Sequence, residues 1–232
     1  MLDATKGYEF TIRFGEETDT LDLEGEVVDT SDARPTLEQV EALLPRFSGE
    51  IEQTPPVYSA LKIEGKPAYA RARAGEQVDL KPRRVTIREL TIRHRESGND
   101  EVTFSCTVSK GTYIRSLARD IARALGTVGH VSYLRRTRAG PFTLDSAISL
   151  DFLEEAAKAR ALTRTVLPLT AALDDIPALP VTPDQAQLLR HGQKLVGIPA
   201  QPGLCVAMLE ETPVALIEAS ADGLRVVRGF NL

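Results

Sequence analysis

Arginine side chains recur at intervals of four residues in the middle of the sequence. Arg115, Arg119 and Arg123 would share one stripe on a helix, and a second group of arginines follows within residues 135–138. Guanidinium groups bind phosphates and carboxylates through paired hydrogen bonds, although such stripes also occur on ordinary solvated helix surfaces. The pattern therefore indicates either a cleft that binds an anion or plain surface solvation.

The charge is distributed unevenly along the 232 residues. The net charge of −5 disfavours a histone-like protein that binds nucleic acid by charge alone. Residues 1–50 carry 4 basic and 13 acidic side chains, whereas residues 62–138 carry 17 basic and 8 acidic ones, a net charge of +9. A basic middle between acidic ends indicates a face that binds a polyanion, or a run of solvated charges.

Other kinds of site are not indicated by the sequence. Cys106 and Cys205 are the only cysteines, and each lies in an alternating apolar run, so we expect reduced thiols in the core. The three histidines lack metal-ligand spacing, and we expect no metal site. The sequence contains neither a run of about 20 apolar residues nor a signal peptide, so we expect a cytoplasmic protein without a membrane partner.

Hydrophobic periodicity predicts the elements that position the arginines. Period-two alternation predicts strands at residues 8–14, 85–92, 102–108 and, more briefly, 130–134. From Thr112 the apolar period becomes helical and ends at Gly126, while Thr36 caps a second helix that runs to about Phe47. Residues 53–82 are rich in proline and glycine, which indicates an irregular insertion with one short helix near residues 68–74.

The C-terminal part of the chain differs in character. A helix is expected over residues 149–161, and three prolines in residues 176–183 indicate a boundary. A short helix and three strands follow, at residues 184–190, 204–209, 214–218 and 224–228. We therefore predict a main domain over residues 1–175 and a small β-rich domain over residues 176–232.

The order of local motifs resembles the bacterial tRNA pseudouridine synthase B (TruB) family. Five strings match in collinear order: Tyr8 to Gly15 with Thr18-Asp19-Thr20 and Gly25; Gln53-x-Pro55-Pro56-x-Tyr58-Ser59-Ala60-x-Lys62; Gly65 with Ala68-Tyr69; Lys110-Gly111-Thr112-Tyr113-Ile114-Arg115; and His130-Val131-x-Tyr133-Leu134-Arg135-Arg136. Each string is weak alone, but together they span nearly the whole chain.

The resemblance implies an α+β fold and an RNA-modifying activity. The expected catalytic domain is a mixed, largely antiparallel sheet with flanking helices and a thumb-like insertion at residues 53–82, followed by a PUA-like domain. The family isomerises a uridine of the tRNA T-arm loop, uridine-55, to pseudouridine without a cofactor. The enzyme breaks the glycosidic bond and rejoins the base through carbon, which requires that the base is flipped outward.

The resemblance also assigns roles to particular residues. Tyr8 would pack against the target base, Tyr113 would lie near enough for proton transfer, and Leu134 would line the uridine pocket. Arg115 would hold the catalytic carboxylate ionised and oriented. Spacing alone would favour Tyr8 as a core residue and Tyr113 with Arg115 as the start of a helix, and the collinear resemblance reverses that preference. The basic side chains expected to contact RNA are Lys62, Arg135 and Arg136.

The nucleophile that the resemblance implies is missing from the sequence. The family carries it in a Leu-Asp-Pro-x-Ala-Thr-Gly string before the first matched strand, and these 232 residues contain no such string. Asp19, Asp22 and Asp120 are poor substitutes, so we expect no carboxylate opposite Arg115. We accordingly expect an inactive fragment that lacks an N-terminal part of the catalytic domain. The alternative is a noncatalytic RNA-binding module.

Overall fold

The computed structural model of the protein describes residues 4–94, 100–173 and 176–231. Contacts between residues divide the chain into two compact units, Met1–Ala139 and Gly140–Leu232. The domain boundary that the prolines predict at residue 176 stays a prediction. Within the described residues, no helix combines the length and the apolar character needed to cross a membrane.

The first unit is built on an antiparallel sheet. Its strands lie in the order β9-β1-β8-β7-β4. Their bounds are β1 (Lys6–Phe14), β4 (Gly49–Gln53), β7 (Arg83–His94), β8 (Glu101–Val108) and β9 (Gly129–Ala139). The predicted strands at residues 8–14, 85–92 and 102–108 are therefore confirmed. A separate pair, β2 (Glu16–Thr18) and β3 (Val27–Thr30), follows β1.

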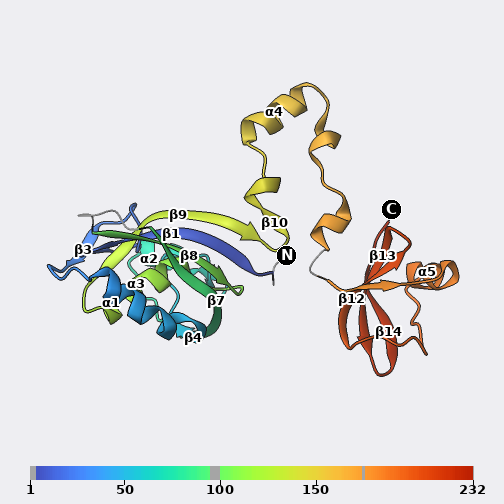
Figure 1. The fold of residues 1–232 in the computed structure, drawn as a ribbon, viewed down its shortest axis with the longest axis horizontal. Helices are drawn as coiled ribbons and strands as arrows, with labels where there is room; N and C mark the ends of the chain where they lie inside the picture. Colours follow the sequence, from blue (N-terminus) through green and yellow to red (C-terminus); the bar gives the residue numbers. More distant parts are fainter. Residues whose placement is uncertain (1–3, 95–99, 174–175, 232) are drawn as a thin grey trace. The chain divides into compact units, whose positions relative to one another are not determined.

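Two helices pack on one face of this sheet (Figure 1). The helix α3 (Ile114–Ala124) buries its apolar stripe, and α1 (Leu37–Leu43) continues into a 3₁₀ turn (Leu44–Phe47). The predicted cap of α1 is confirmed, because the Thr36 hydroxyl accepts from the Gln39 N–H while Gln39 Oε1 accepts from the Thr36 N–H. The predicted stop of α3 is confirmed at Gly126, whose positive φ of 75° favours glycine.

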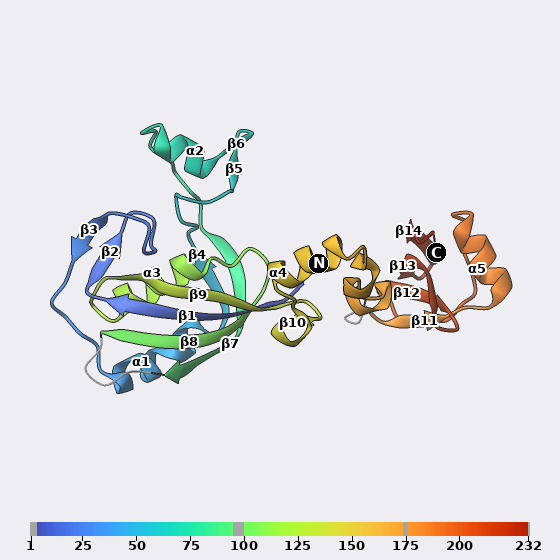
Figure 2. The same cartoon turned by 90° about the horizontal axis from the view of Figure 1, so that it is seen from above.

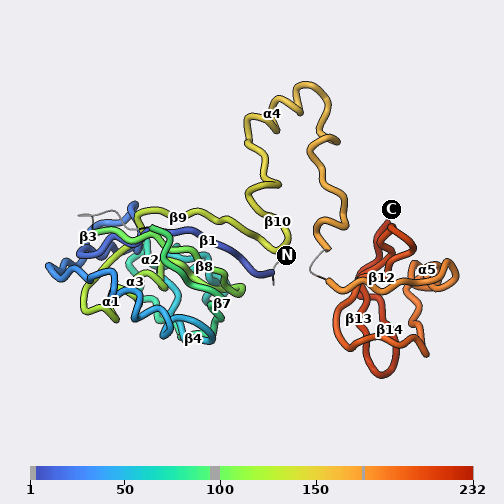
Figure 3. Tube along the Cα trace, in the orientation of Figure 1, coloured from blue at the N-terminus to red at the C-terminus, as the bar shows by residue number. Residues whose placement is uncertain are grey.

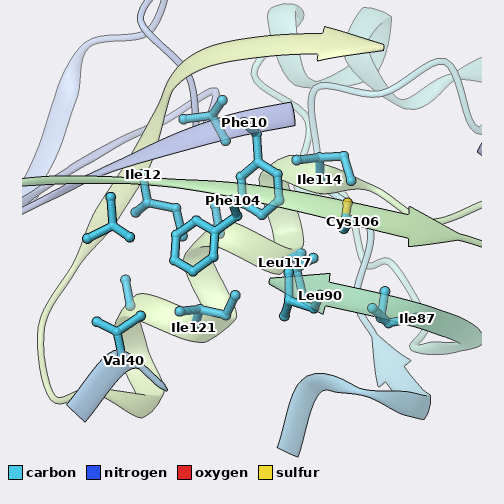
Figure 4. Close-up of a cluster of buried hydrophobic side chains, with 14 of the residues drawn as sticks. Phe10, Ile12, Val40, Ile87, Leu90, Phe104, Cys106, Ile114, Leu117 and Ile121 are labelled. Atoms are coloured by element: carbon cyan, nitrogen blue, oxygen red, sulfur yellow. The ribbon is translucent and has the colours of Figure 1, made fainter. Parts of the chain in front are cut away.

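The core lies between the sheet and these helices (Figure 4). Phe10 of β1 and Phe104 of β8 stack with ring centroids 5.2 Å apart, and both side chains are fully buried. Leu117 and Ile121 of α3 and Val40 of α1 close the cluster from the helical side. The period-two strands and the period-3.6 helix thus meet on their apolar faces.

The middle of the insertion at residues 53–82 stands away from the sheet, whereas its first residue, Gln53, ends β4 (Figure 2). The insertion contains the two short strands β5 (Lys62–Ile63) and β6 (Lys66–Pro67), which pair antiparallel, and the helix α2 (Ala68–Arg73). The helix confirms the one predicted near residues 68–74. The strands have only two residues each, which is too short for a periodic signal.

The strand β9 is longer than its apolar residues predicted. It was expected over residues 130–134, but it runs from Gly129 to Ala139 and includes Arg135 and Arg136. The reason is that β1 pairs along this whole length, so that the backbone ladder extends the strand past its apolar residues. The register shifts between Gly7 and Tyr8, whose partners are Arg138 and Arg136, and this leaves Thr137 as an extra residue.

The second unit contains a small four-stranded sheet in the order β11-β12-β13-β14. Its strands are β11 (Ala178–Pro180), β12 (Gly203–Leu209), β13 (Thr212–Ser220) and β14 (Gly223–Gly229), with α5 (Pro183–Arg190) beside them (Figure 3). The three strands and the helix predicted here are confirmed. The edge strand β11, which pairs parallel to β12, was missed because its proline suggested a loop.

The segment before this sheet carries the short strand β10 (Phe142–Thr143) and the helix α4 (Leu150–Lys158). The helix was predicted over residues 149–161, and its Ser149 cap accepts a hydrogen bond from the Phe152 N–H. The chain thus combines helices with largely antiparallel sheets, which confirms the α+β class.

Both cysteines are free thiols in the core, as predicted. Burial raises the pKa of the Cys106 thiol from 9.0 to about 12, which outweighs the hydrogen bond from the Tyr8 backbone. Below pH 9 the thiol is protonated in the folded and unfolded states alike. Between pH 9 and 12 the unfolded chain ionises first, so stability falls by about 1.4 kcal/mol per pH unit.

We therefore expect the free energy of unfolding to fall from pH 9 to pH 10 more steeply in the wild type than in Cys106→Ala. Urea unfolding at the two pH values measures the difference. Equal pH dependence in the two proteins would show that Cys106 ionises freely in the folded state.

Candidate active site

Arg115 joins three segments that are far apart in the sequence. Its Nη1 donates to the Asp22 carboxylate at 2.9 Å and to the Thr20 carbonyl at 2.9 Å, and its Nη2 donates to the Tyr58 carbonyl at 2.8 Å. The expectation that no carboxylate faces Arg115 is therefore wrong. Asp22 lies four residues after the end of β2, in a loop that brings its carboxylate against Arg115 in the first turn of α3.

The Asp22 carboxylate is held by several donors at once. Its Oδ2 accepts from Arg115, while its Oδ1 accepts from the Thr20 hydroxyl at 2.6 Å and from the Glu24 N–H at 3.1 Å. Gly25 closes this loop, where a Cβ would collide with Asp19 and Thr20. A carboxylate with both oxygens engaged is held in a fixed orientation and can orient Arg115 in turn.

Two cavities border the Arg115–Asp22 pair. Both are lined by Asp22, Glu24 and Arg115. The first, of about 420 Å³, is completed by Leu23, Val131, Ser132, Tyr133 and Leu134, and the second, of about 390 Å³, by Thr20, Tyr58, Ser59, Ala60, Tyr69, Arg73 and Tyr113. The structure thus brings together Tyr113, Arg115 and Leu134, three of the residues singled out in the sequence.

Tyr8 lies on β1 of the main sheet, away from both cavities. It packs against the core cluster from β1, and the guanidinium of Arg136 lies 5.8 Å from its ring centroid. It lines neither of the two cavities around Arg115. Of the other predicted RNA contacts, Arg135 follows the cavity residue Leu134 on β9 and pairs opposite Glu9 of β1, whereas Lys62 lies on β5 of the insertion.

The arginines of the α3 stripe are all engaged in ion pairs within the protein. Besides Arg115, Arg119 pairs with Asp120 at 2.8 Å, and Arg123 pairs with Glu17 of β2 at 2.7 Å. Each guanidinium thus already has a carboxylate partner. The exposed arginines of β9 are consequently the better candidates for contacts with an external polyanion.

Several residues of the site were not singled out as functional by the sequence. Tyr58, Tyr69 and Arg73 come from the insertion, and their only signal was membership in the matched strings or their neighbourhood. A hydrogen bond to Asp19 raises the pKa of Tyr58, because the nearby carboxylate disfavours the phenolate. Among the described residues, no three His, Cys, Asp or Glu side chains are grouped so that they could hold a metal ion.

Comparison with known proteins decides the family. Residues 1–114 match the family model described as "TruB family pseudouridylate synthase (N terminal domain)", and residues 115–174 match "tRNA pseudouridylate synthase B C-terminal domain". The tRNA pseudouridine synthase B of Zymomonas mobilis is 59% identical over 230 residues, which are 99% of this chain and 75% of that protein. The chain belongs to the TruB family.

Further relatives agree with this assignment. The tRNA pseudouridine synthase B of Novosphingobium aromaticivorans is 55% identical over 100% of this chain and 77% of its own length, and that of Caulobacter vibrioides is 46% identical over 100% and 78%. The resemblance seen in the motifs is therefore confirmed. TruB proteins are pseudouridine synthases, which are isomerases.

Solved structures show the same fold. A structure described as a Cbf5-Nop10-Gar1 complex matches with a TM-score of 0.68 and 25% identity, over 98% of this chain and 66% of that one. An H/ACA RNP bound to a substrate RNA containing 2'-deoxyuridine matches with a TM-score of 0.70 and 22% identity, over 100% and 67%. Both support the α+β fold of this TruB chain.

Proposed function

We propose that this chain recognises tRNA at the T-arm and that its site serves the isomerisation of the loop uridine, uridine-55, to pseudouridine. The observation that carries the proposal is the cavity of about 420 Å³ with Leu134 and the Arg115–Asp22 pair on its wall. An extruded base needs an apolar surface to lie on and polar groups to orient it. Leu134 supplies the first, and the pair supplies the second.

The family assignment and the charge distribution support the RNA partner. The relatives carry the name tRNA pseudouridine synthase B, and Arg135 and Arg136 are exposed on β9 next to the residues of the cavity. Tyr113 starts the helix that bears Arg115, and the guanidinium of Arg83 lies 5.6 Å from its ring centroid. Tyr113, on the wall of the second cavity, is the candidate for proton transfer, and Tyr8, which lines neither cavity, is the candidate for stacking on the base.

We also propose that these 232 residues alone do not convert uridine to pseudouridine. They contain no Leu-Asp-Pro-x-Ala-Thr-Gly string, and Asp22, the carboxylate at Arg115, has both oxygens engaged. The polypeptide would then bind RNA and carry the arginine that orients a catalytic carboxylate, without the nucleophile itself. This keeps the alternative of a noncatalytic RNA-binding module for the isolated chain.

The test uses a T-arm stem-loop transcript with a labelled loop uridine. The Zymomonas mobilis relative serves as the positive control on the same RNA. We expect the 232-residue protein to bind the transcript without forming pseudouridine. Conversion would overturn the proposed inactivity, whereas absence of binding would overturn the proposed RNA function.

RNA affinity is expected to depend steeply on salt through the arginines of β9. Each contact between a cationic side chain and a phosphate adds roughly 0.7 to 0.9 to the slope of log K against log salt. The double variant Arg135→Ala/Arg136→Ala should flatten that slope by about 1.5 and weaken binding about tenfold at low salt. Fluorescence anisotropy with the T-arm transcript at several salt concentrations measures the slope.

The matched control is Arg46→Ala, because Arg46 is exposed at the end of the 3₁₀ turn after α1, in the acidic N-terminal part of the chain. Its slope should equal that of the wild type. An unchanged slope in the double variant would remove the two arginines from the RNA interface.

A further inference from the structure

A buried glutamine accepts a hydrogen bond from the N-cap of α3, the helix that carries Arg115. Gln53 is the last residue of β4, and its side chain is only 1% exposed. Its Oε1 accepts a hydrogen bond from the backbone N–H of Tyr113 at 2.8 Å. Tyr113 is the N-cap of α3, and its own side chain makes no capping hydrogen bond. The start of α3 is therefore fixed by a residue 60 positions away in the sequence.

The residues that follow Gln53 are fastened to the same helix. We call residues 54–59 the insertion base. The Thr54 carbonyl accepts from the Ser116 hydroxyl at 2.8 Å and from Arg119 Nη2 at 3.2 Å. The Tyr58 carbonyl accepts from Arg115 Nη2 at 2.8 Å. Side chains from the first two turns of α3 thus hold both ends of the insertion base.

The insertion base in turn holds the start of α2. The Tyr69 N–H donates to the Ser59 carbonyl at 3.0 Å, and the Ala68 N–H donates to the Leu61 carbonyl at 2.7 Å. Hydrogen bonds and the backbone of the insertion base together therefore connect α3 to the part of the insertion that projects in Figure 2. A displacement at the start of α3 would be transmitted along this connection to Tyr69, which lines the second cavity.

We propose that Gln53 is a positioning residue, which sets Tyr113 and Arg115 in place relative to the insertion base. The side-chain amide of Gln53 uses its oxygen and leaves its nitrogen unpaired among the described residues. Its Nε2 is buried and has no hydrogen-bond partner within the described part of the chain. Burying an unpaired amide donor is unfavourable, and methionine would fill the same space without that donor. The acceptor oxygen is then the feature that this position needs.

The proposal rests on the proposed function only for the catalytic roles of Tyr113 and Arg115. The positioning itself is a property of the folded chain, so that it can be tested without RNA or catalysis. If Gln53 does not position α3, the proposed function still stands. If the chain neither binds RNA nor catalyses, the positioning by Gln53 still stands.

The test is hydrogen exchange of backbone amides in the full chain. In Gln53→Met the Tyr113 N–H loses its acceptor, and we expect its amide, and those of Ala68 and Tyr69, to exchange about tenfold faster. Gln53→Glu keeps an acceptor oxygen, next to the positive end of the α3 dipole, and should restore wild-type exchange at all three amides. A second perturbation, Ser116→Ala, should accelerate Ala68 and Tyr69 in the same direction.

The matched control is Gln39→Met, which removes the same kind of bond at the start of α1, where Gln39 Oε1 accepts from the Thr36 N–H at 2.8 Å. It should leave Tyr113, Ala68 and Tyr69 at wild-type rates. Unchanged rates in Gln53→Met would overturn the proposal. Equal acceleration in Gln53→Glu, or the same acceleration at the Phe10 and Phe104 amides of the core strands, would also overturn it, since either result would indicate general destabilisation.

Discussion

Replacement of Arg115 with methionine is expected to lower the free energy of unfolding by about 2 kcal/mol. Three hydrogen bonds disappear, to Asp22, Thr20 and Tyr58, and the carboxylate is left without its cation. Breaking a buried ion pair costs about 3 to 5 kcal/mol. The Arg115 and Asp22 side chains are 24% and 28% exposed, so that solvent screening reduces this cost. Urea unfolding monitored by circular dichroism measures the loss.

The control for Arg115 is Arg13→Met. Arg13 also pairs with a carboxylate, Glu101, at 2.8 Å, but its side chain is 46% exposed, and the expected loss is below about 1 kcal/mol. Adding Asp22→Asn completes a double-mutant cycle, in which Arg115 and Asp22 should couple by about 1 kcal/mol. If Arg115→Met and Arg13→Met cost the same, the three-segment junction at Arg115 contributes no special stability.

Replacement of Phe104 with alanine should have the largest effect on stability, a loss of about 3 to 5 kcal/mol. The ring is fully buried at the centre of the sheet and stacks on Phe10. Its removal forfeits the transfer free energy of the ring. It also leaves a cavity, because the neighbouring strands β1 and β7 are too constrained to close around the missing atoms. The same unfolding experiment measures it.

Phe152→Ala removes the same atoms from a side chain that is 51% exposed on α4. We expect a loss below about 1 kcal/mol there, because little apolar surface returns to water. A loss below about 1.5 kcal/mol for Phe104→Ala would mean that the core can collapse around the missing ring, contrary to the close packing of the cluster.

Elements with a strong local signal were predictable from the sequence. The alternation from Tyr8 to Phe14 marks a strand because one face of the sheet is buried. The helix after Thr112 was visible because Ile114, Leu117 and Ile121 share one face. The cap at Thr36 is a short-range interaction within one turn, so that the local sequence suffices to predict it.

The junction at Arg115 was not predictable in the same way. Asp22 lies 93 positions from its partner, in a turn that has no periodicity, and pairing over that distance is decided by the whole fold. Its only signal was the turn-rich string that ends in Gly25. Strand β9 was underestimated for a related reason, because its length is set by the partner strand β1 and not by the arginines themselves.

The extra residue Thr137 in β9 has a consequence for how the arginines are divided between the two faces of the sheet. Side chains of paired residues in an antiparallel ladder lie on the same face, so Arg136 shares the face of Tyr8, whereas Arg138 shares that of Gly7. In a regular strand, residues 136 and 138 would lie on one face. A regular ladder that kept Thr137 would turn Arg138 over to the side of Tyr8, whereas deleting Thr137 would remove the bulge and leave Arg138 on the face of Gly7. The register of the strand, as well as its residue types, therefore specifies which side of the sheet each arginine occupies.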